Sequence, residues 1–266
     1  MINKNYNKNF LFLAMISLLM AGILTFIIVF SRVPLIKDVF IFKDLFKKAL
    51  SVHVNLSQLF WILIFSIFIL LNYFKIPQKI KQLSLLSFSI SLILMLASSF
   101  SQKQAILNNY VPAIDSSIFD FSINLFFITI VIIIAFILPN LFKPKESWQK
   151  SYFISLALII TISLINYILS LAKLPNKDNL YLFYETKFWA FGHILQFSYV
   201  VILTYCWHLF INLTQKSKFS YDKYCHYFNY IYIFFAVISL IFFFQRYEAY
   251  FFHLFTLQMI YLSSFL

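Results

Sequence analysis

Two histidines in this sequence lie inside strongly apolar stretches, where an imidazole can do chemistry. They are His53 in "SVHVNLSQLFW" and His193 in "FWAFGHILQFSY". A neutral imidazole can bind a metal ion through one ring nitrogen while a hydrogen-bond acceptor holds the other. Polar groups in hydrocarbon are costly and tend to face the interior of a helix bundle. These two histidines are therefore candidate metal ligands.

Each of the two also has a simpler interpretation. His53 is expected near the outer end of its helix, sharing a face with Ser57 and Trp61, where it could bond a loop or a lipid headgroup. His193 is expected roughly 9–14 Å deep, at 1.5 Å per residue, where an interhelical hydrogen bond is the alternative to a ligand. Gly192 fits both interpretations, because its missing side chain lets a helix or a flat cofactor approach.

The composition places these histidines in a membrane. Hydrophobic residues make up 62% of the chain and charged residues 11%, whereas soluble domains carry about 25% charged residues. The net charge of +12 does not indicate nucleic acid, because Lys and Arg are spread in small groups between apolar runs. Cations in that arrangement flank membrane spans and touch lipid headgroups, so the lipid bilayer is the expected partner.

Seven apolar runs approach or exceed the ~20 residues that a transmembrane helix needs. They cover residues 10–30, 49–74, 83–100, 119–139, 151–172, 187–213 and 225–245. A further run over residues 251–266 is short for a span and is interpreted as a partial eighth helix. The first run exceeds the ~7–15 residues of a signal-peptide core and should be retained. The sequence thus predicts an all-α, polytopic transmembrane helix bundle, with residues 1–266 in a single integral membrane domain.

The loops predict the orientation of the bundle. One set of loops, together with the N-terminus, carries eleven lysines, and the opposite set carries nine Lys or Arg. The positive-inside rule then places the N-terminus in the cytoplasm, as in a multi-pass protein of the bacterial inner membrane. Residues 35–50, "LIKDVFIFKDLFKKAL", hold four of the nine opposing charges and are interpreted as an amphipathic segment on the outer surface.

Several other polar residues in the spans are expected to serve packing. Asn166 and Ser170 stand one helical turn apart, with Ser163 a turn earlier, which is typical of a polar seam between helices. Cys206 and Cys225 have no metal-ligand spacing and are interpreted as packing residues.

The remaining charged and histidine side chains are expected to be hydrated. His208 and His226 fall near the cytoplasmic boundary, and Glu185 and Lys187 near the outer boundary, ahead of or at the start of the sixth span. No carboxylate is expected within the membrane, which disfavours an ion- or proton-coupled transporter. Helices broken by Gly or Pro, which transporters use, are not predicted either.

Four stretches, taken in order, resemble the heme-copper oxidase superfamily, meaning cytochrome c oxidase subunit I and its shorter relatives. Residues 51–65, "SVHVNLSQLFWILIF", resemble helix two of that subunit. Residues 108–115, "NNYVPAID", look like one of its outer loops. Residues 188–199 resemble the Gly-His motif of helix six, and residues 251–259, "FFHLFTLQM", resemble the stretch after helix seven.

The resemblance implies cofactors and ligands. His53 would ligate a heme, and His193 and His253 would ligate copper. With the N-terminus in the cytoplasm, the predicted spans place all three histidines toward the outer face of the membrane.

The chain also departs from the family pattern. Phe252 stands where the family has the first histidine of a pair, Phe197 where it has a cross-linked tyrosine, and Ile194 where it has a proline. The resemblance covers only helices one to seven, and a later helix supplies further heme ligands.

These departures imply a truncated or degenerate subunit that is not catalytic alone, and a second polypeptide carrying the later helices is the implied partner. The alternative is a non-enzymatic membrane scaffold or assembly protein, and a transporter ranks behind both.

Overall fold

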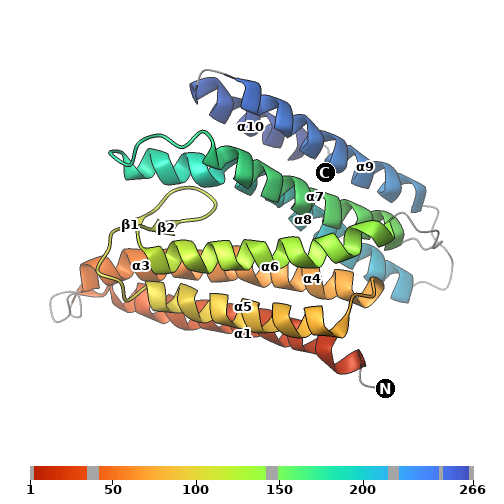
Figure 1. Cartoon of the computed structure of the whole chain (residues 1–266), viewed down its shortest axis with the longest axis horizontal. Coiled ribbons are helices and arrows are strands. Elements are labelled where there is room, and N and C mark those ends of the chain that lie inside the picture. Colours follow the sequence, from red (N-terminus) through yellow and green to blue (C-terminus); the bar gives the residue numbers. More distant parts are fainter. Residues whose placement is uncertain (1–2, 35–41, 142–148, 215–221, 246–247, 264–266) are drawn as a thin grey trace. The chain divides into compact units, whose positions relative to one another are not determined.

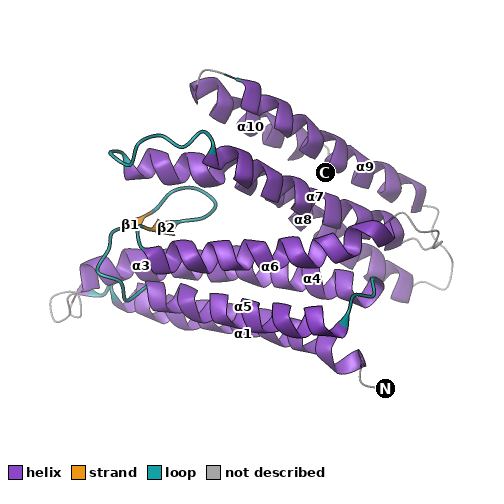
Figure 2. Ribbon diagram, viewed as in Figure 1, coloured by secondary structure: helices purple, strands orange, loops and turns teal. Residues whose placement is uncertain are grey.

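The described residues of the chain are almost entirely helical (Figure 2). The computed structural model describes residues 3–34, 42–141, 149–214, 222–245 and 248–263. They group into two compact units. Unit 1 comprises Met1–Ile137 with Pro175–Glu185, and unit 2 comprises Leu138–Leu174 with Thr186–Leu266. Each unit is described separately below.

Seven of the described helical segments are long and apolar enough to cross a membrane. They are Tyr6–Phe30, Leu45–Tyr73, Gln78–Ser98, Ser117–Leu141, Gln149–Leu171, Leu180–Thr214 and His226–Phe244. Each overlaps one predicted apolar run, so the all-α class is confirmed and seven helices qualify by length and composition as membrane spans. A further helix, α10 (Glu248–Ser263), covers the region predicted as a partial eighth.

Unit 1 is a bundle of long helices lying side by side (Figure 1). Its elements are α1 (Asn3–Phe30), α3 (Phe42–Val54), η1 (Asn55–Phe60), α4 (Trp61–Tyr73), α5 (Gln78–Ser98) and α6 (Ser117–Leu141). Helix α4 ends at Tyr73, just before a short turn. Pro77 is the N-cap residue of α5, at the start of the helix, where a missing N–H costs little.

Aromatic rings fill the core of unit 1. Phe60 stacks on Phe126 with ring centroids 4.0 Å apart, and Phe88 lies 5.2 Å from Phe126. Phe10 of α1 meets Phe88 edge to face at 6.2 Å. All four side chains are fully buried, so α1, η1, α5 and α6 share one apolar core.

The second span contains one wide turn. Residues Asn55–Phe60 form a π-helix, in which the Trp61 N–H donates to the Leu56 carbonyl five residues earlier. The Ser17 hydroxyl of α1 donates to the same carbonyl at 2.9 Å. The helical register from His53 to Trp61 is therefore not that of a regular α-helix, on which the shared face of these residues was predicted.

Residues 42–50 are not a separate surface segment, contrary to the prediction. They belong to α3, which runs through the π-turn into α4, and the span itself begins at Leu45. Residues 35–41 of the predicted amphipathic segment lie outside the described residues.

A small hairpin joins α5 to α6. Strand β1 (Ala105–Ile106) pairs antiparallel with β2 (Ala113–Ile114), in the register Ala105 opposite Ile114 and Ile106 opposite Ala113. Tyr110, at the tip, has a positive φ of 63°. The sequence predicted a loop here without strands.

Unit 2 is formed by α7 (Gln149–Leu171), most of α8 (Leu180–Thr214), α9 (Asp222–Ile238), the 3-10 helix η2 (Ser239–Phe244) and α10. The predicted polar seam holds two of these elements together. Asn166 of α7 donates to the Ser239 hydroxyl at 3.0 Å, and that hydroxyl lies 2.6 Å from the Ala236 carbonyl. Ser163 instead bonds its own helix, and the buried Ser170 hydroxyl has no partner among the described residues.

Lys173 ties the end of α7 to the segment that follows η2. Its ammonium donates to the Gln245 carbonyl at 2.8 Å and lies 5.1 Å from the centre of the Phe251 ring. Burial lowers the pKa of Lys173, because the charged form loses hydration.

Candidate functional site

His53 is half-buried at the end of α3 and is held by helix α1. Its Nδ1 lies 2.8 Å from the Ala21 carbonyl oxygen and 3.3 Å from the Thr25 hydroxyl. A carbonyl only accepts hydrogen bonds, so this contact assigns the proton to Nδ1 and leaves the lone pair on Nε2. That is the tautomer in which an imidazole binds a metal through Nε2.

His193 is 2% exposed in α8, and its ring is held by its own helix. Nδ1 lies 3.0 Å from the Trp189 carbonyl, one turn earlier, which again assigns the proton to Nδ1. The Trp189 ring lies 4.4 Å from the imidazole and the Phe255 ring 5.8 Å, measured between centroids. Aromatic side chains therefore surround this histidine.

His253 is exposed on α10, and other residues of α10 face α8. Phe252 meets Trp189 at 5.1 Å with perpendicular rings, and Phe255 is the α10 residue that contacts His193. The structure does not bring the two predicted copper ligands into contact with each other. Among the described residues, no group of three or more His, Cys, Asp or Glu side chains is placed to hold a metal ion.

Phe197, at the position of the family's tyrosine, also packs against another aromatic ring. Phe197 is buried and lies 5.8 Å from the Tyr232 ring of α9. Ile194 is fully buried as well. Both residues contribute apolar contacts to unit 2.

Unit 1 contains a polar network, involving the first turns of α8, that was not predicted from the sequence. Helix α8 begins at Leu180, earlier than predicted, so Glu185 and Lys187 lie within it and are each only 6% exposed. The prediction that both are solvated is wrong, and Glu185 is a carboxylate inside a membrane-type helix. It accepts hydrogen bonds from the Asn109 backbone N–H at 2.9 Å and from the Asn109 side-chain amide at 2.5 Å.

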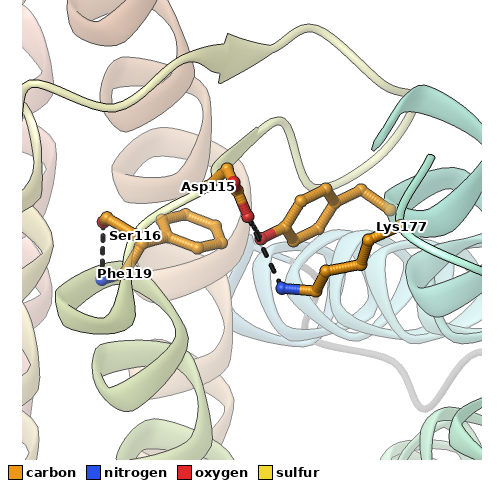
Figure 3. A network of polar contacts seen from close by, with 5 residues as sticks. Asp115, Ser116, Phe119 and Lys177 are labelled. Atoms are coloured by element: carbon orange, nitrogen blue, oxygen red, sulfur yellow. Dashed lines mark hydrogen bonds and ion pairs between the residues drawn. The ribbon is translucent and has the colours of Figure 1, made fainter. Parts of the chain in front are cut away.

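A second set of contacts joins the loop before α6 to the start of α8 (Figure 3). The Tyr184 hydroxyl donates to the Asp115 carboxylate at 3.0 Å, and the Lys177 ammonium lies 3.6 Å from the same oxygen. Ser116 then caps α6 by accepting from the Phe119 N–H at 3.2 Å. Two acidic residues thus anchor the loop before α6 to residues 177–185.

The pKa of the Tyr110 phenol is shifted by burial and by Glu185 of this network. Burial and, to a lesser extent, the negative charge of Glu185 together raise its pKa to about 12, because both disfavour the phenolate. Tyr110 therefore stays protonated throughout the physiological range.

Of the two remaining histidines, His208 is buried and His226 is partly exposed. His208 is 6% exposed and lies 3.1 Å from the Tyr152 hydroxyl, so the expectation that it is hydrated is wrong. His226 is partly exposed and bonds the Ser151 hydroxyl at 2.5 Å. Cys206 is half-buried and free, whereas the Cys225 side chain lies outside what the structure describes.

Comparison with known proteins identifies two distant relatives. The chain is 24% identical over 282 residues to an uncharacterized protein of Rickettsia prowazekii, covering 90% of this chain and 54% of the relative. It is 28% identical over 209 residues to an uncharacterized protein of Aquifex aeolicus, covering 75% of this chain and 52% of the relative. The chain thus spans about half the length of these relatives.

No protein-family model and no solved structure matches the chain. The seven apolar helices define it as a multi-pass, membrane-type helical protein.

Proposed function

We propose that this chain is a multi-pass inner-membrane protein equivalent to the N-terminal half of a heme-copper oxidase subunit, and that it is not catalytic alone. In this proposal His53 would be the residue of this chain that holds a heme. The observation that carries it is the 2.8 Å contact of His53 Nδ1 with the Ala21 carbonyl, which leaves Nε2 as the coordinating atom. The two relatives come from bacteria, which supports an inner-membrane location.

The described residues fit part of the heme site. His53 offers one neutral imidazole, and the carbonyl behind it orients the ring and makes Nε2 more basic. A heme held this way would supply electron transfer. The protein's own contribution is the Ala21 carbonyl, which accepts from the His53 Nδ1 and keeps the proton on that nitrogen. In this proposal any further ligand to the heme would come from a second polypeptide.

The copper half of the resemblance fits less well. The His193 ring packs against Phe255 of α10, and His253 is exposed on the same helix. We therefore derive no copper chemistry from these residues. This arrangement favours the second candidate function, a non-enzymatic membrane scaffold in which His193 serves packing.

Hemin binding to the detergent-purified chain distinguishes the two functions. We expect a Soret band in the native protein, its loss in His53→Ala, and its retention in His253→Ala, the matched control with an exposed imidazole. Metal analysis of the same samples tests the copper hypothesis for His193 and His253. A spectrum that is equally empty in all three proteins would contradict the proposed heme site and leave the scaffold as the remaining candidate function.

A further inference from the structure

The hairpin between α5 and α6 is bonded to two other parts of unit 1. Its first attachment is to the second span, which carries His53. Asn55, fully buried at the start of the π-turn, donates to the Pro112 carbonyl at 2.7 Å and to the Ser51 carbonyl at 2.9 Å. One side-chain amide therefore joins the span to the hairpin.

Hydrogen bonds within the hairpin couple its two attachments to each other. The Asn108 amide donates to the Val111 carbonyl at 3.0 Å, and its oxygen accepts from the Ala113 N–H at 3.0 Å. These bonds hold Tyr110 at its positive φ of 63°, a conformation that a bulky residue rarely adopts.

The second attachment is to the first turns of α8. Asn109 donates twice to Glu185, and Asp115 accepts from Tyr184. Hydrogen bonds to an ionised carboxylate are about twice as strong as neutral ones. In agreement with these bonds, residues Pro175–Glu185 group with unit 1 and the remainder of α8 does not.

We propose that the hairpin, residues 105–115, is a clamp that joins the His53-bearing span to the first turns of α8, and that Glu185 is the group that closes it. A carboxylate in a membrane-type helix is costly unless its oxygens are satisfied. Asn109 satisfies both of them, which gives Glu185 a reason to be inside the helix. While the pair is made, the hairpin and the start of α8 cannot separate. The clamp is independent of whether His53 binds heme.

Limited trypsin digestion of the detergent-purified full chain tests the clamp. Lys103 is exposed just ahead of β1, and it becomes a better substrate when the hairpin opens. Lys75 is exposed in the turn between α4 and α5 and serves as an internal reference. The readout is the ratio of cleavage after Lys103 to cleavage after Lys75.

We expect Glu185→Ala and Asn109→Ala each to raise this ratio by about tenfold, the effect of losing a charge-assisted pair. The double variant should be no worse than either single variant, because both remove the same interaction. Glu185→Gln should give an intermediate ratio, and Asp178→Ala, which removes an exposed carboxylate from the same segment, should leave it unchanged.

Two results would overturn the proposal: an unchanged ratio in Glu185→Ala, or additive effects in the double variant. A ratio that is unchanged because cleavage at both lysines rises in equal proportion would mean that Glu185 supports the whole fold and not this attachment. Hemin binding is measured separately, so a failed heme proposal leaves the outcome for the clamp unaffected.

Discussion

At the residue scale, the Asn166 amide makes a specific bond between helices of unit 2. Replacing Asn166 with Ala removes its bond to Ser239 while the Ser239 hydroxyl keeps its partner at Ala236. Interhelical side-chain bonds in membranes are worth about 0.6 kcal/mol on average and up to about 1.7. We expect a loss of this size in the unfolding free energy measured in bicelles.

The matched control for that substitution is Ser163→Ala. Ser163 is equally buried on α7, but it bonds only the Ile159 carbonyl of its own helix. It should therefore be close to neutral. Equal losses in Asn166→Ala and Ser163→Ala would show that the bond to Ser239 contributes nothing.

The Tyr110 phenol gives a residue-scale prediction about pH. Its pKa is about 12 in the folded chain, against about 10 in an unfolded one. Between these values the folded chain keeps a proton that the unfolded chain has lost, so the unfolding free energy falls as pH rises from about 10 to 12. Tyr110→Phe should reduce this slope, measured by denaturation at pH values of about 9, 10 and 11. An identical slope in both proteins would contradict the burial of this phenol.

The predicted polar seam is confirmed at Asn166, which bonds another helix, but not at Ser163 or Ser170. The partner of Asn166, Ser239, was not predictable from sequence. Glu185 and His208 were misplaced because their burial depends on partners far along the chain, at Asn109 and Tyr152. No local spacing encodes such pairs.

At the element scale, the π-turn in the second span is supported from a different helix. The Leu56 carbonyl accepts from both the Trp61 N–H and the Ser17 hydroxyl. Ser17→Ala removes the second donor, so the turn should open more often. We expect faster amide hydrogen exchange across Asn55–Trp61, by about fivefold for a loss near 1 kcal/mol.

Ser89→Ala is the control for that experiment, because Ser89 bonds only the Leu85 carbonyl of its own helix. It should leave exchange across the π-turn unchanged. If Ser17→Ala also leaves exchange unchanged, the wide turn is set by the sequence of the second span itself.

Apolar run length predicted the number and order of the spans but not how they begin. Helix α8 starts at Leu180 because its first turns are bonded to the hairpin, and this contact is invisible in a hydropathy profile. The two-residue strands of the hairpin are likewise too short to leave a period-two pattern. The Ser17 hydroxyl that bonds the π-turn lies 39 positions before the carbonyl that accepts from it.

At the scale of the whole molecule, unit 1 has two polar ends that can be told apart. One end holds the hairpin, with Asn55 bonded to Pro112 and Lys48 bonded to the Ser101 carbonyl at 2.6 Å. The other end holds the start of α1, where Asn7 bonds the Leu71 carbonyl and accepts from Lys81. A membrane-spanning unit must place these ends on opposite sides of the bilayer.

The lysine distribution predicts which end is cytoplasmic, because positively charged loops are retained inside. We expect the α1 end inside and the hairpin outside, which puts His53 near the outer face. Single cysteines at Lys79 and Lys103, both exposed, test this in a background without Cys206 and Cys225. A membrane-impermeant maleimide should label Lys103→Cys in intact cells, provided that any outer membrane is permeabilised, and Lys79→Cys only after lysis. The reverse labelling would place the hairpin end of unit 1 in the cytoplasm and contradict the orientation predicted from the lysines.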